Sequence, residues 1–166
     1  MKAEKLYLVG FMGAGKTTVA RALARRLDWR VADIDDLIER REHLTVSELF
    51  ARQGESYFRA IERAVLLEQI GVRHTVVATG GGTFVDPQNR ALINTDGASV
   101  WLDVPLEGLV ARVPAGGRRP LAADRAEFER LYLVRRAAYE QAHLRIDAGR
   151  VSVPAIIEQL VDWLEA

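Results

Sequence analysis

Two periods of hydrophobic positions alternate along the chain. Short apolar runs, typical of buried strands, are separated by longer segments in which apolar residues recur every three or four positions, as on one face of a helix. Strands are predicted at Leu6–Val9, Val31–Ile34, Thr75–Thr79 and Ser99–Val104, with a weaker pattern around Leu144–Ile146. Helices are predicted through Val19–Leu27, Leu37–Ile38, Phe58–Val65, Glu127–Gln141 and Pro154–Leu164.

Capping residues mark further helix boundaries. Thr45 followed by Glu48 is the pattern of a capping box that opens a short helix. Asp86-Pro87 is typical of an N-cap with proline at the first helical position. By contrast, Arg112–Arg125 contains two prolines, two glycines and several arginines, which predicts a loop.

The alternation of strands and helices predicts an α/β fold in three layers, with a parallel sheet covered by helices on both faces. In such sheets ligands bind at the carboxyl ends of the strands. The glycine-rich turns, a pair of aspartates and the arginine-rich loop all follow strands or lie between elements. We therefore expect them to converge on one edge of the sheet.

The composition of the chain excludes some classes of binding partner and of metal site. The chain has 166 residues, which predicts one domain over 1–166. Its 23 Lys and Arg balance 23 Asp and Glu, so no global field favours nucleic acid or an anionic membrane. The absence of cysteine excludes disulfides and thiolate metal sites and fits the cytosol. No signal peptide or membrane span is expected, and we expect a cytoplasmic monomer.

The segment Gly10–Thr17 fits the P-loop pattern G-x-x-x-x-G-K-[ST] between a strand and a helix. Such a loop turns backbone N–H groups toward phosphate oxygens, and the following helix N-terminus adds partial positive charge. Lys16 would reach the β- and γ-phosphates, and the Thr17 hydroxyl would ligate Mg²⁺. The predicted nucleotide-binding residues here are Gly13, Ala14, Gly15, Lys16, Thr17 and Thr18. The alternative, a chance glycine-rich turn, is disfavoured by the strand–loop–helix context.

Asp33 and Asp35 flank Ile34 in the second predicted strand. Residues two apart on a strand share a face, so both carboxylates are expected to point the same way. Beside an ATP site, one could act near the metal and the other on an acceptor hydroxyl. The alternative is an N-cap for the following helix, supplied by Asp35 or Asp36.

Three further features favour a second anion site and a lid. Arg59 lies next to the apolar stripe of its helix, although a solvated surface arginine is the alternative. Gly80–Gly82 follows a strand, and three glycines in succession suggest close approach of backbone to a ligand. Arg118 and Arg119 lie in the predicted loop, which could close as a lid and bring a cation onto the transferring phosphoryl group.

Together these segments resemble the shikimate kinase family. The matching segments are GFMGAGKTT (Gly10–Thr18), DID (Asp33–Asp35), FRAIE (Phe58–Glu62), TGGG (Thr79–Gly82), RRPL (Arg118–Leu121) and the R-x-x-x-Y of Arg135–Tyr139. The resemblance extends from Leu6 to about Leu164. It implies a P-loop NTPase fold of the nucleoside-monophosphate-kinase type, with a central five-stranded parallel sheet and a lid at about residues 113–125. It also implies ATP-dependent phosphorylation of the 3-hydroxyl of shikimate, a step of aromatic amino-acid biosynthesis.

The resemblance further implies residue roles on the substrate side. Asp35 would hold the acceptor hydroxyl, within substrate-binding helices at about residues 35–71. Arg59 and Arg135 would bind the shikimate carboxylate, with the Gly81 backbone beside the substrate. Spacing to Tyr139 selects Arg135 over its neighbour Arg136.

On the nucleotide side, the resemblance implies that Asp33 acts on Mg²⁺ through water. Arg119 would be the catalytic cation of the lid, next to the nucleotide, and Arg112 would lie against the adenine. Two other hypotheses stay open at this point. One is a kinase of the same fold that acts on gluconate or a nucleoside monophosphate, and the other is a non-catalytic nucleotide-binding module.

Overall fold

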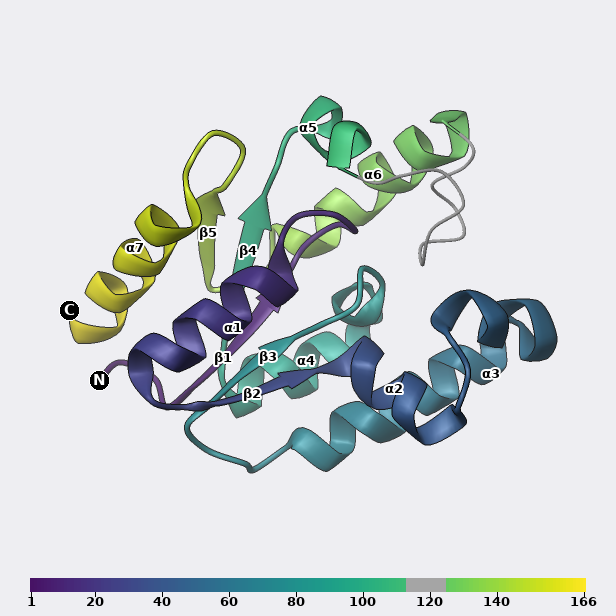
Figure 1. Ribbon diagram of the computed structural model, residues 1–166, viewed down its shortest axis with the longest axis horizontal. Helices are drawn as coiled ribbons and strands as arrows, with labels where there is room; N and C mark the ends of the chain where they lie inside the picture. Colours follow the sequence, from purple (N-terminus) through teal and green to yellow (C-terminus); the bar gives the residue numbers. More distant parts are fainter. Residues whose placement is uncertain (113–124) are drawn as a thin grey trace.

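Five parallel strands form the centre of the molecule (Figure 1). The computed structural model describes residues 1–112 and 125–166. The strands are β1 (Lys5–Val9), β2 (Arg30–Asp33), β3 (Thr75–Ala78), β4 (Ala98–Asp103) and β5 (Leu144–Asp147), in the order β2-β3-β1-β4-β5. Every neighbouring pair is parallel. The predicted five-stranded α/β fold is confirmed.

Helices connect the strands and cover the sheet. They are α1 (Lys16–Leu27), α2 (Ile34–Glu42), α3 (Val46–Gln69), the 3₁₀ turn η1 (Thr83–Val85), α4 (Pro87–Asp96), α5 (Leu106–Arg112), α6 (Arg125–Tyr139) and α7 (Val153–Glu165). Helices α1 and α7 pack together on one face of the sheet, and α4 lies on the other (Figure 1). Among the described residues, no helix is both long and apolar enough to cross a membrane.

The position of each strand follows from its sequence. Strand β1 lies in the middle of the sheet, and all five of its residues are buried, as expected for an apolar run covered on both faces. Strand β2 lies at an edge, where Arg30 and Val31 are exposed. The molecule therefore has its core around β1, β3 and β4, whose residues are all buried, and the loop after β1 begins at the end of the central strand.

Two predicted boundaries were wrong. Ile34 does not end the second strand but begins α2, because the preceding Asp33 caps that helix. The two ends of the predicted loop Arg112–Arg125 are helical, since Arg112 is the last residue of α5 and Arg125 the first of α6, while residues 113–124 lie outside the described residues. A short helix before Arg112 was not predicted at all.

The two predicted helix starts at Thr45 and Asp86 are confirmed. The Thr45 hydroxyl accepts from the Glu48 backbone N–H and the Glu48 carboxylate accepts from the Thr45 backbone N–H, which is a complete capping box. The Asp86 side chain accepts hydrogen bonds from two backbone N–H groups of α4. Inside α3, Gly54 has φ 83° and ψ 173°, so a short helix and a long one meet at this glycine, as the sequence pattern indicated. The long part carries Arg59 toward the carboxyl end of the sheet.

At that end, α2 and α3 stand on one side of the loop after β1, and α5 and α6 stand on the other (Figure 1). Residues from the loop after β1, the end of β2 and the turn after β3 therefore face the same space, as expected for a parallel sheet.

Candidate active site

The loop between β1 and α1 has the conformation that its glycines predict. Gly13 and Gly15 have φ of 84° and 96°, a region that only glycine adopts without strain. Lys16 begins α1, and its side chain folds back over the loop. Its Nζ donates to the carbonyl oxygens of Gly10 at 2.5 Å and Phe11 at 3.1 Å. A buried ammonium thus lies at a helix N-terminus, where backbone N–H groups and the helix dipole favour a phosphate.

A cavity of about 210 Å³ lies beside this loop. Its lining residues are Gly13, Ala14, Gly15, Lys16, Thr17, Thr18, Asp33, Asp35, Thr79 and Arg112. The six P-loop residues predicted to bind nucleotide therefore all line one cavity. Arg112 closes one side, where its Nη1 lies 3.4 Å from the carbonyl oxygens of Gly13 and Ala14.

Asp33 and Asp35 both reach the cavity, but not by the predicted strand alternation. Asp33 ends β2 and is the N-cap of α2, so Asp35 lies in the first turn of a helix. The Asp33 Oδ1 accepts from the Asp36 backbone N–H at 3.1 Å, and its Oδ2 accepts from the Thr17 hydroxyl at 2.6 Å. The N-cap alternative is thus correct, with Asp33 rather than Asp35 or Asp36 in that position. An aspartate satisfies the unpaired N–H groups of a helix start, which ends the strand there.

The turn Gly80–Gly82 brings together one side chain from each of three helices. A Cβ added at the first glycine would lie 3.0 Å from the Oδ1 of Asp35, on α2. At the second glycine it would lie 3.0 Å from the Nη1 of Arg135, on α6. At the third it would lie 2.5 Å from both terminal nitrogens of Arg59, on α3. The three glycines therefore leave room for close packing of these side chains against the backbone.

Arg59 and Arg135, called the arginine pair below, are close enough to affect each other. Burial lowers the pKa of Arg135, and the positive charge of Arg59 acts in the same direction. The Tyr139 hydroxyl and the charge of Glu62 oppose this lowering at Arg135, whereas Arg59 pairs directly with Glu62 at 3.0 Å. Two partly buried guanidinium groups of this kind form a site that a carboxylate, with two oxygens, would stabilise.

Arg136, the neighbour of Arg135, faces away from this site. Its Nη1 donates to Asp103 at 3.2 Å and to the Tyr132 hydroxyl at 2.8 Å, and its guanidinium lies 4.9 Å from the centre of the Trp101 ring. Consecutive helix residues point in different directions, so only one of the two arginines can face the glycine turn.

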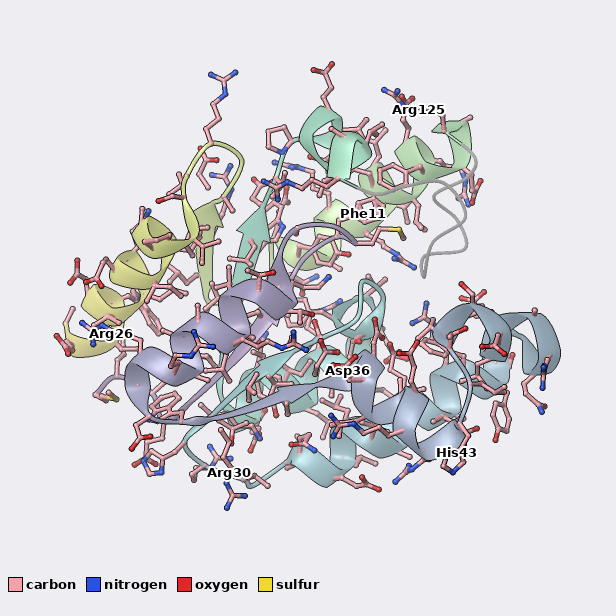
Figure 2. The ribbon with its side chains drawn as sticks, in the orientation of Figure 1. Phe11, Arg26, Arg30, Asp36, His43 and Arg125 are labelled. Atoms are coloured by element: carbon pink, nitrogen blue, oxygen red, sulfur yellow. The ribbon has the colours of Figure 1, made fainter. Side chains whose placement is uncertain are left out.

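Phe11 links the loop after β1 to helix α6. Its ring lies 5.0 Å from that of Phe128 and 5.6 Å from that of Tyr132, and the Arg135 guanidinium lies 5.9 Å from its centre. Figure 2 shows Phe11 at the tip of the loop, on the side that faces α6. The P-loop and α6, the helix that carries Arg135, are therefore packed against each other.

Comparison with known proteins decides the family. A family model described as shikimate kinase matches residues 12–165. This chain belongs to the shikimate kinase family. It is 38% identical over 159 residues to shikimate kinase from Persephonella marina, covering 95% of this chain and 97% of that one. It is 42% identical over 170 residues to shikimate kinase from Novosphingobium aromaticivorans, covering 96% and 88%.

A solved structure supports the same assignment. Shikimate kinase from Acinetobacter baumannii, in complex with shikimate, superposes with a TM-score of 0.93 at 32% identity, covering 98% of this chain and 93% of that one. The predicted resemblance to shikimate kinases is thus confirmed over nearly the whole chain.

In this member of the shikimate kinase family, three buried polar side chains near the arginine pair make contacts that the sequence did not predict: Glu62 and Tyr139 lie in matching segments but were given no role, and Thr83 was not singled out. Glu62 accepts from Arg59 Nη1 at 3.0 and 3.2 Å and from the Thr83 hydroxyl at 2.9 Å. The Tyr139 hydroxyl donates to the Gly81 carbonyl oxygen at 2.5 Å. Glu62 stands three residues after Arg59, a spacing that could have indicated the pair. No local pattern indicated Thr83.

Burial sets the ionisation of these groups. It raises the pKa of Glu62, while Arg59 and the Thr83 hydroxyl act in the opposite direction. It also raises the pKa of Tyr139, which keeps the phenol protonated as a donor to Gly81.

The predicted lid lies almost wholly outside the described residues. Residues 113–124, with Arg118, Arg119 and Leu121, belong to the part of the chain about which the structure is silent. Within the described ranges, no group of three or more His, Asp or Glu side chains could hold a metal ion.

Proposed function

We propose that this protein transfers the terminal phosphoryl group of ATP to the 3-hydroxyl of shikimate, giving shikimate 3-phosphate and ADP. One observation supports this proposal above the others. Asp35 and the arginine pair all lie against the Gly80–Gly82 turn, and Asp35 also lines the cavity of the P-loop. Shikimate combines a carboxylate with ring hydroxyls, which is the pair of groups that these side chains suit.

The arginine pair would bind the carboxylate. Guanidinium groups are planar and donate two parallel hydrogen bonds to a carboxylate, which lysine does not do. The Gly81 backbone, held by Tyr139, would lie beside the bound ring. The substrate would thereby be fixed by its carboxylate, away from the reacting hydroxyl.

Asp35 would hold the acceptor hydroxyl and accept its proton. Its side chain lines the P-loop cavity and also lies over Gly80, so it stands between the nucleotide and the carboxylate site. Phosphoryl transfer depends mainly on positioning and on charge stabilisation. Lys16 would supply positive charge to the β- and γ-phosphates, and residues Gly13–Thr18 would hold them.

Mg²⁺ would be held by Thr17 directly and by Asp33 through water. The Thr17 hydroxyl oxygen lies 2.6 Å from the Asp33 Oδ2, and both residues line the same cavity. Mg²⁺ prefers oxygen ligands of this kind. A protein site with few ligands fits this ion, because Mg²⁺ keeps several waters and binds substrate phosphates as well. When bound, it would neutralise charge on the phosphates.

One assay separates this proposal from its rivals. ADP release is measured with shikimate, gluconate or AMP as the only acceptor. We expect release with shikimate alone, and Lys16→Met should remain folded but lose about 100-fold or more in kcat, since it removes a charge on the phosphates. Release with gluconate or AMP instead of shikimate would show another kinase of the same fold. ATP binding without ADP release in the presence of any of the three acceptors would indicate a nucleotide-binding module.

Three parts of the proposal rest on the sequence alone. Arg119 as the catalytic cation of a lid stays a prediction, since it lies outside the described residues. The monomeric state and the cytoplasmic location also stay predictions. Kinetics of Arg119→Ala and the elution volume in size-exclusion chromatography would test the first two.

A further inference from the structure

Thr83 connects the glycine turn to the partner of Arg59. Its side chain is fully buried and makes two hydrogen bonds. The hydroxyl accepts from the Gly80 backbone N–H at 3.0 Å and donates to the Glu62 Oε2 at 2.9 Å. Its own backbone N–H donates to the Gly80 carbonyl oxygen at 3.3 Å. The hydroxyl thus bridges the turn after β3 and a carboxylate on α3.

Glu62 in turn holds Arg59. Both carboxylate oxygens of Glu62 accept from Arg59 Nη1, and the side chain of Glu62 is only 1% exposed. The Arg59 guanidinium lies directly over Gly82, where there is no room for a Cβ. Four groups therefore form a closed chain of contacts: turn, Thr83, Glu62 and Arg59.

We propose that the Thr83 hydroxyl is a positioning group for shikimate, which sets Arg59 relative to the Gly80–Gly82 turn through Glu62. This proposal deepens the proposed function and rests on it. Thr83 does not touch the substrate. Its hydroxyl donates a hydrogen bond to the Glu62 carboxylate and accepts one from the Gly80 backbone N–H, so it holds the partner of Arg59 at a fixed distance from the turn.

Removal of the hydroxyl should affect shikimate rather than ATP. Thr83→Val keeps the shape of the side chain but leaves the Gly80 N–H without its acceptor and Glu62 without one donor. A lost hydrogen bond of this kind corresponds to roughly a fivefold change in an equilibrium constant. We expect KM for shikimate to rise by about fivefold and KM for ATP to stay within about twofold, since the two partners of the Thr83 hydroxyl, Gly80 and Glu62, do not line the P-loop cavity.

The pH dependence provides a readout that a purely structural role would not change. The charged groups that face Glu62 are Arg59 on its own helix, Asp35 on α2 and Arg135 on α6. The Thr83 hydroxyl is one of the groups that oppose the rise in the pKa of Glu62. In Thr83→Val that pKa should be higher, so Glu62 becomes protonated, and releases Arg59, at a higher pH than in the wild type. KM for shikimate should therefore rise more steeply on acidification in the variant.

The experiment compares Thr83→Val with Thr83→Ser and with a matched control. Thr83→Ser keeps the hydroxyl and should restore a wild-type KM for shikimate. Thr75→Val is the matched control. It also removes a buried threonine hydroxyl, which bonds to the Arg73 carbonyl oxygen, but it does so at the other end of β3, away from the arginine pair. Steady-state kinetics and shikimate titrations are measured from pH 6 to 8 for all variants. If Thr83→Val does not fold, Thr83→Ala against Thr83→Ser isolates the hydroxyl in the same way.

Each outcome supports or overturns the proposal. An unchanged KM for shikimate in Thr83→Val, an equal rise in KM for ATP, or the same effect in Thr75→Val would overturn it. Loss of shikimate affinity in Thr83→Ser would overturn it as well, since the hydroxyl is present there. If the wild type itself neither binds nor phosphorylates shikimate, the proposed function fails first. The two failures are therefore distinguishable.

Discussion

The Thr17 hydroxyl donates a hydrogen bond to the Asp33 carboxylate at 2.6 Å, which joins the P-loop helix α1 to the end of strand β2. The other oxygen of Asp33 caps α2, the helix that carries Asp35. The Asp33 carboxylate thus fixes the position of the P-loop helix α1 relative to α2, the helix that carries Asp35. Catalysis of phosphoryl transfer depends on such relative positioning.

Asp35→Asn should lower kcat by about 100-fold or more, because an amide cannot accept the proton of the acceptor hydroxyl. KM for ATP should change little. Asp36→Asn is the matched control, since Asp36 is its neighbour on α2 and pairs with exposed Arg21. Unchanged kcat with weaker ATP binding in Asp35→Asn would instead place this carboxylate on the metal side.

Arg135→Ala should weaken shikimate binding by about 10- to 150-fold, the equivalent of one charged hydrogen bond. Arg136→Ala should leave binding nearly unchanged, because Arg136 is paired with Asp103 outside the site. Shikimate titrations of the two variants test this. The reverse ranking would refute the assignment of Arg135, and Arg135→Lys should recover only part of the loss, since lysine lacks the planar pair of donors.

Gly82→Ala should weaken shikimate binding with little change in stability. Its new methyl group would lie 2.5 Å from the terminal nitrogens of Arg59, so this flexible side chain must move away from the turn. Gly82 has φ −100°, which alanine adopts without strain. We expect an increase in KM for shikimate, measured beside an unchanged KM for ATP. Equal increases in both would mean that the whole turn is displaced.

Asp96→Asn should destabilise the protein at the amino end of the sheet. Burial alone would raise the pKa of Asp96, but hydrogen bonds from Lys5, Tyr7 and the Gly71 backbone lower it to about 2. The folded pKa lies below the unfolded value of about 3.9, so the stabilisation is present above about pH 4 and is lost as the pH falls toward 2. Removal of the charge leaves buried Lys5 with the Gln69 carbonyl oxygen but without its carboxylate partner, which costs about 3–5 kcal/mol.

Urea denaturation at pH 7, 4 and 3 tests this expectation. Between pH 4 and 3 the wild type should lose more stability than Asp96→Asn, because only the wild type takes up a proton at this site when it unfolds. The double variant Lys5→Met/Asp96→Asn should recover part of the loss at pH 7, since no unpaired charge stays buried. Equal pH dependence of wild type and Asp96→Asn would show that Asp96 does not carry the effect.

The order of the strands and of the helices other than α5, the P-loop and the family could all be predicted from the sequence. Each depends on interactions between residues close in the chain: the apolar period, the caps at Thr45 and Asp86, and the glycines that permit positive φ. The same local reasoning failed at Asp33–Asp35. Strand alternation and an N-cap are both local signals there, and the cap prevailed because Asp33 also accepts from Thr17, 16 residues away.

The tertiary structure alone decided how the arginine pair is held. Glu62 and Thr83 are 21 residues apart, and the Tyr139 hydroxyl reaches Gly81 across 58 residues. No periodicity records such contacts, because they depend on how α3 and α6 pack beside the turn after β3. Buried polar groups must find hydrogen-bond partners wherever packing places them, so these partners become visible only when the helices are in position.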